Sequence, residues 1–178
     1  MSAVKSNTQR IAILGAESSG KSALAEALAQ RYQTVWVPEY LREFVEMQQR
    51  VPRESEQVMI ACTQLEREDA MALKANEWLF CDTTPLMTAI YSEYYFSSAG
   101  DELMALADQH HYDFTVVTAP DLPWVADGLQ RESPAVRQAI HERVLEKLEE
   151  REIPHLLIEG SLTQRVEQVA FALTFLMT

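Results

Sequence analysis

The residues best suited to chemistry lie near the start of the chain. The pattern G-x-x-x-x-G-K-[ST] is matched by Gly15, Ala16, Glu17, Ser18, Ser19, Gly20, Lys21 and Ser22. In such a loop, successive backbone N–H groups surround phosphate oxygens, and the glycines let the backbone approach them closely. Lys21 would supply a positive charge to the β- and γ-phosphates, and the Ser22 hydroxyl would bind Mg²⁺. The segment therefore predicts a nucleoside triphosphate site, with ATP and Mg²⁺ as the expected cofactors.

The flanking segments support this interpretation. Residues 11–14 form a short apolar run that includes β-branched isoleucines, as in a buried strand, and residues 22–31 are rich in strong helix formers. A phosphate-binding loop requires this order of strand, glycine loop and helix. The alternative is a glycine turn that only starts a helix and leaves Lys21 in solvent. Such a turn would not require the motif to stand between a buried strand and a helix.

A second candidate group follows the next apolar run. Glu39 and Tyr40 come directly after it, and Arg42 lies three residues beyond Glu39. A carboxylate at this position could accept the proton of an attacking hydroxyl, and Arg42 could neutralise a phosphate or anchor the carboxylate. Alternatively, Glu39 complements a helix dipole and pairs with Arg42 on a solvated helix face.

A third candidate, Asp82, ends an apolar run that begins at Trp78. A carboxylate there would bind the Mg²⁺ shell or the acceptor ribose. It could also cap the following helix, and the two roles are compatible.

The segment from Pro123 to Ser133 contains an Asp-Gly turn and precedes a long helical pattern. It is suited to a lid that closes on the triphosphate, with Arg131 or Arg137 reaching the γ-phosphate. An ordinary surface loop would have the same pattern.

Strand-like runs alternate with helical patterns along the chain. Helices separate the runs, the clearest being Pro134–Glu152, and Ser161 to Gln164 has the pattern of a helix-starting capping box. The alternation predicts an α/β fold, a three-layer P-loop NTPase or kinase fold in which five parallel strands have helices on both faces. The candidate residues then share the carboxyl edge of the sheet. The expected strands are Arg10–Leu14, Thr34–Val37, Trp78–Cys81, Phe114–Val117 and His155–Ile158.

Composition restricts the remaining possibilities. The length of 178 residues predicts one domain over residues 1–178, and the net charge of −12 argues against nucleic acid as a partner. Two cysteines are too few for a disulfide framework. We find no signal peptide pattern and no apolar stretch long enough for a membrane span, so we expect a cytoplasmic protein with a small-molecule substrate. Nothing in the sequence specifies an oligomeric state.

Together these motifs resemble the ribosylnicotinamide kinase family, which includes the kinase domain of bacterial NAD-salvage regulators. The resemblance extends from Ile11 to Ile158 and implies ATP- and Mg²⁺-dependent phosphorylation of the 5′-hydroxyl of nicotinamide riboside. It further implies that Glu39 is the base or the anchor of the acceptor hydroxyl, and that Asp82 holds the acceptor ribose or the metal shell. The motifs concerned are residues 14–22, Glu39-Tyr40 with residues 42–44, Asp82-Thr83, and Trp124-Val125 with residues 127–129.

The sequence also departs from the family pattern. Pro38 stands where members with riboside kinase character tend to carry an aromatic residue, Thr84 where they carry a second Asp, and Gln130 where an Arg usually follows Asp-Gly-Leu. Two alternatives therefore stay open: a kinase for another nucleoside or a vitamin alcohol, and an ATPase switch that regulates a partner.

Overall fold

The computed structural model describes residues 7–125 and 133–177. Five parallel strands form one sheet in the order β2-β3-β1-β4-β5. This confirms the predicted fold class and the position of every strand, with small differences at their ends. The strands are β1 (Gln9–Leu14), β2 (Trp36–Val37), β3 (Trp78–Asp82), β4 (Phe114–Thr118) and β5 (Leu156–Ile158).

Seven α-helices and one short 3₁₀ helix accompany the strands within the described residues. They are α1 (Lys21–Arg31), α2 (Tyr40–Gln48), α3 (Gln57–Ala72), α4 (Pro85–Phe96), α5 (Asp101–Gln109), α6 (Pro134–Glu150) and α7 (Leu162–Leu173), with the 3₁₀ helix at Glu54–Glu56. As expected, Ser161 and Gln164 form a capping box at the start of α7. Within the described residues, no helix is both long and apolar enough to cross a membrane.

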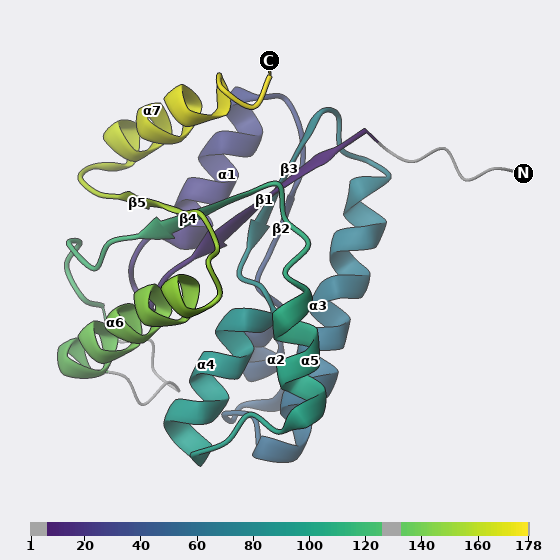
Figure 1. Cartoon of the computed structure of the whole chain (residues 1–178), viewed down its shortest axis with the longest axis vertical. Coiled ribbons are helices and arrows are strands. Elements are labelled where there is room, and N and C mark those ends of the chain that lie inside the picture. Colours follow the sequence, from purple (N-terminus) through teal and green to yellow (C-terminus); the bar gives the residue numbers. More distant parts are fainter. Residues whose placement is uncertain (1–6, 126–132, 178) are drawn as a thin grey trace, which may run out of the picture.

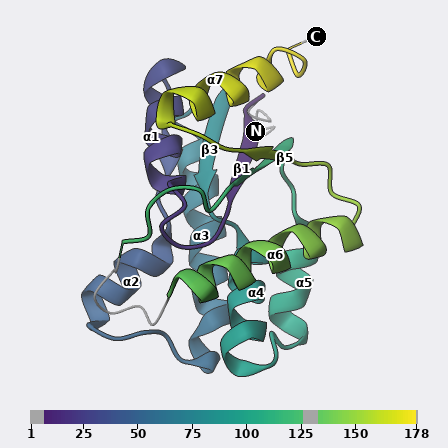
Figure 2. The same cartoon turned by 90° about the vertical axis from the view of Figure 1, so that its left-hand side faces the viewer.

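The helices lie on both faces of the sheet (Figures 1 and 2). Strand β1 illustrates the cause, because its side chains alternate between two cores. Ile11 and Ile13 pack toward α1 and α7, whereas Ala12 and Leu14 pack toward α4 and α6. All four side chains are fully buried. The central strand is therefore apolar on both faces, as a covered parallel sheet requires.

Because all strands are parallel, their carboxyl ends meet at one edge of the sheet. The loops after β1, β2, β3, β4 and β5 begin at Gly15, Pro38, Thr83, Ala119 and Glu159. The sheet thus brings segments more than a hundred residues apart to one edge, where such folds bind ligands.

Candidate active site

The glycine-rich segment forms a tight loop between β1 and α1. Gly15 and Gly20 have φ angles of 154° and 86°. A Cβ on Gly15 would lie 2.1 Å from the Thr118 hydroxyl oxygen of β4, so no side chain fits there. That hydroxyl also bonds the Ser19 hydroxyl at 2.7 Å. The close approach of β4 explains why the loop begins with glycine.

The loop places Lys21 and Ser22 at the start of α1. Lys21 is buried, and its Nζ donates to the Ala16 carbonyl at 3.0 Å. Ser22 donates its hydroxyl hydrogen to Asp82 Oδ2 at 2.6 Å. Asp82 therefore faces the phosphate-binding loop. The alternative role of Asp82 as a helix cap is wrong, because the residue preceding α4 is Thr84 and the hydrogen bond of Asp82 reaches α1 instead.

This pair of oxygen ligands fits Mg²⁺. Asp82 is fully buried, and its Oδ1 has no hydrogen-bond partner within the described residues. In the same part of the chain, no three His, Cys, Asp or Glu side chains form a metal-binding group. Mg²⁺ usually takes one or two carboxylates and fills its octahedron with phosphate oxygens and waters. Ser22 and Asp82 would supply the protein ligands in such a site.

Glu39 lies at the carboxyl end of β2, beside this group. Its side chain is 9% exposed. Burial raises its pKa to about 8, although the charge of Lys21 opposes the shift and the charge of Asp82 adds to it. Burial also raises the pKa of Asp82, against Lys21 and the hydrogen bond from Ser22. The two carboxyls thus share one buried, electrostatically linked site, and the solvated-face alternative for Glu39 is wrong.

Tyr40 and Arg42 occupy the first turn of α2. Tyr40 is half-buried, with the guanidinium of Arg67 4.6 Å from its ring centroid. Arg42 is exposed, but its charge lowers the pKa of both Glu39 and Asp82. It is therefore near enough to act on an anion bound between them.

The structure describes one of the two arginines expected to reach the γ-phosphate, Arg137. Arg137 is 9% exposed in α6, where its Nη1 donates to the backbone oxygens of Ser18 at 3.2 Å and Leu122 at 2.7 Å. Its guanidinium thus contacts the phosphate-binding loop directly. Arg131 and the Asp-Gly turn lie outside the described residues.

Two buried polar side chains at the site were not among the residues selected from the sequence. Gln64 of α3 accepts from the Tyr40 N–H at 2.8 Å and donates to the Pro38 carbonyl at 3.4 Å, on either side of Glu39. Arg165 of α7 donates to the Ser19 carbonyl. Both lie on the buried face of their helix, beside apolar residues such as Ile60 of α3 and Val169 of α7. A polar residue on such a face is the signal that would have found them.

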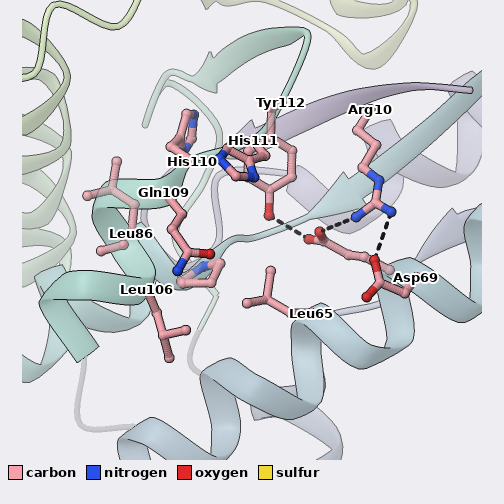
Figure 3. Close-up of a pocket in the computed structure, with 12 residues that line it drawn as sticks. Arg10, Leu65, Asp69, Leu86, Leu106, Gln109, His110, His111 and Tyr112 are labelled. Carbon is pink, nitrogen blue, oxygen red and sulfur yellow. Dashed lines mark hydrogen bonds and ion pairs between the residues drawn. The ribbon is translucent and has the colours of Figure 1, made fainter. Parts of the chain in front are cut away.

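A separate cavity of about 190 Å³ lies at the opposite edge of the sheet, where β1 begins (Figure 3). The buried carboxylate of Glu68 accepts from the Tyr112 hydroxyl at 2.7 Å and lies 3.5 Å from the Arg10 guanidinium. Arg10 also contacts Asp69 at 2.8 Å. Burial raises the pKa of Glu68 to about 7, against the bond from Tyr112 and the charge of Arg10. Arg10 and Tyr112 lie at the amino ends of β1 and β4, whereas the phosphate-binding loop follows the carboxyl end of β1.

Comparison with known proteins shows which family the chain belongs to. The family model described as an AAA domain matches residues 10–165. The trifunctional NAD biosynthesis/regulator protein NadR of Escherichia coli (strain K12) is 31% identical over 154 residues. The match includes 84% of this chain but only 38% of that protein, so the chain spans well under half of its relative's length.

Solved structures share the fold. A crystal structure of a NadR protein in complex with NR matches with a TM-score of 0.78 at 20% identity, over 93% of this chain and 50% of the other. Thymidylate kinase from Candida albicans matches with a TM-score of 0.65 at 13% identity, over 94% and 92% of the two chains. The fold is that of P-loop kinases. The chain therefore belongs to the AAA domain family and is a homologue of the NadR proteins, as its resemblance to the ribosylnicotinamide kinase family led us to expect.

Proposed function

We propose that this chain is an ATP- and Mg²⁺-dependent kinase that phosphorylates the 5′-hydroxyl of nicotinamide riboside to give nicotinamide mononucleotide. The observation that carries the proposal is the contact between Ser22 and Asp82, with the buried Glu39 beside them. This arrangement places two ligands for Mg²⁺ and a carboxyl group for the acceptor side next to the phosphate-binding loop.

Each residue has a distinct part in this reaction. The backbone N–H groups of residues 15–20 and the Lys21 ammonium hold the phosphates. Arg137 or Arg131 adds a positive charge at the γ-phosphate. Bound Mg²⁺ would neutralise charge on the β- and γ-phosphates. Glu39 would orient the acceptor hydroxyl and take its proton, while Tyr40 and Arg42 line the acceptor side.

The carboxyl groups favour a cationic acceptor. Burial raises the pKa values of Glu39 and Asp82 because it disfavours their ionised forms. A positive charge bound nearby would offset this cost by stabilising the two carboxylates. The pyridinium ring of nicotinamide riboside carries such a charge, and uncharged nucleosides do not. The NR complex of a NadR protein supports the same choice, with NR read as nicotinamide riboside. The proposal includes a cytoplasmic location.

A second candidate is a kinase for a different nucleoside or a vitamin alcohol. Pro38 and Thr84 favour it, because they flank the acceptor side and depart from the pattern of riboside kinases. The thymidylate kinase match supports a nucleoside-related acceptor of another kind.

The deciding experiment measures ADP release and phosphorylated product with MgATP and a panel of nicotinamide riboside, common nucleosides and vitamin alcohols. We expect the largest turnover with the riboside, and none in Lys21→Ala, which removes the loop cation while leaving the fold intact. Turnover with another acceptor alone would select the second candidate. Hydrolysis that no hydroxyl compound stimulates would contradict both and favour the ATPase switch.

A further inference from the structure

Arg165 connects three loops at the carboxyl edge of the sheet. Its side chain is 1% exposed. Nε donates to the Gly160 carbonyl at 2.9 Å after β5, and Nη2 donates to the Ala119 carbonyl at 3.0 Å after β4. Nη1 donates to the Ser19 carbonyl in the phosphate-binding loop. The guanidinium also pairs with the Asp121 carboxylate, which compensates its buried charge.

The contact with Ser19 fixes the direction of one peptide group. In a trans peptide the carbonyl and the following N–H point in opposite directions, and no peptide bond of the described chain is cis. Because the Ser19 carbonyl points toward Arg165 of α7, the N–H of Gly20 in the same peptide group must point away from α7. Gly20 directly precedes Lys21, so this N–H belongs to the set that would surround a phosphate.

The neighbouring peptide is held in the same manner. Arg137 of α6 donates to the Ser18 carbonyl, which turns the N–H of Ser19 away from the guanidinium. Packing is tight here, because a Cβ on Gly20 would lie 3.2 Å from Arg165 Nη1 and 2.9 Å from a Leu122 methyl carbon. Two arginines from two helices thus hold consecutive carbonyls of the loop.

We propose that Arg165 is a positioning residue for phosphate binding: by holding the Ser19 carbonyl, it keeps the Gly20 N–H directed toward the bound phosphates. The inference rests on the proposed function, since it concerns the same phosphate site. Arg165 acts through the backbone and does not touch the nucleotide itself. Its contacts after β4 and β5 hold the guanidinium in place, so the planar, fork-shaped group is needed in addition to its charge.

The test compares Arg165→Lys with Gln168→Leu. Lysine keeps the charge but cannot reach the four acceptors together. Gln168 is a matched control on the same helix, because its side chain hydrogen-bonds the backbone N–H and carbonyl of Glu159, after β5, instead of the phosphate-binding loop. Isothermal titration with MgATP and with magnesium tripolyphosphate measures binding, and thermal unfolding of each protein measures stability.

We expect Arg165→Lys to bind both compounds about tenfold more weakly than the wild type, and Gln168→Leu to stay within about twofold. In turnover assays the KM for ATP should rise while the KM for the acceptor is unchanged. The amide resonance of Gly20, one of five glycines, should shift with tripolyphosphate in the wild type and much less in Arg165→Lys.

Unchanged MgATP binding in Arg165→Lys overturns the inference, and so does an equal loss in Gln168→Leu. Binding of MgATP and transfer of its phosphoryl group to a hydroxyl are measured in separate assays. Arg165-dependent MgATP binding without transfer to any hydroxyl would defeat the proposed function and still support the positioning role. A wild-type chain that binds neither MgATP nor tripolyphosphate overturns both.

Discussion

Glu39 and Asp82 are two buried carboxyls with different partners, which suggests different tasks. Asp82 bonds the Ser22 hydroxyl and has a further oxygen available for a cation. Glu39 follows β2 and depends on the charge of Lys21 to offset its burial. We therefore propose metal binding for Asp82 and proton transfer for Glu39.

Replacing Glu39 with Gln should retain MgATP binding and lower turnover about 100-fold or more, because an amide can hold a hydroxyl but cannot take its proton. Steady-state turnover and isothermal titration with MgATP measure the two effects. Glu43→Gln is the control, since Glu43 lies in α2, which begins directly after Glu39, and pairs with Arg67. Near-normal turnover in Glu39→Gln would transfer the base role to Asp82 or to the substrate phosphate.

At the scale of an element, α3 determines where Glu39 is held. Gln64 bonds the backbone on both sides of Glu39, at Pro38 and Tyr40, and is 1% exposed. Because β2 has only two residues, its own ladder gives the turn little support. The Gln64 side chain of α3 holds this turn in place instead.

We predict that Gln64→Leu lowers kcat about tenfold and changes MgATP affinity little, since it loosens the acceptor side and leaves the phosphate-binding loop intact. Gln57→Leu is a matched control, because Gln57 is also buried on α3 but bonds the Arg53 carbonyl. Equal losses of kcat in both variants would indicate a general effect of α3 on stability. An unchanged kcat in Gln64→Leu would remove the positioning role.

The sequence predicted elements better than it predicted polar contacts between them. The five strands follow from short apolar runs, and the phosphate-binding loop follows from a local pattern at fixed spacing. The contacts of Gln64 with the backbone around Glu39, and of Arg165 with Ser19, join residues 24 or more positions apart. Such pairs depend on how the helices pack, and no local pattern encodes that packing. The alternative that Asp82 caps the following helix failed for the same reason, because its hydrogen-bond partner lies 60 residues away.

At the scale of the whole molecule, the ionic network at the opposite edge of the sheet makes stability depend on pH. The pKa of Glu68 rises from 4.5 to about 7 on folding. The folded state therefore binds this proton more tightly, and the resulting stability is fully present below pH 4.5 and is lost as the pH rises through 7.

Glu68→Gln stays neutral and should escape this loss. Relative to the wild type, its free energy of unfolding should increase by about 2 kcal/mol between pH 5 and pH 8. Urea unfolding at several pH values measures the difference. Asp69→Asn is the control, because Asp69 contacts the same Arg10 with a side chain that is 73% exposed. A pH-independent difference for Glu68→Gln would show that Glu68 is ionised throughout.

The contact between Ser19 and Arg165 also bears on how the protein is made. The two residues are 146 positions apart. A ribosome adds about 5–20 residues per second, so Arg165 is synthesised about 7–30 s after Ser19. From the addition of Ser22 until that of Arg165, the nascent chain contains the complete glycine-rich motif but lacks the side chain that we propose orients its backbone. If Arg165 positions the loop as we propose, competence to bind nucleotide is acquired only once Arg165 has been added, well after the sequence signature of the loop is complete.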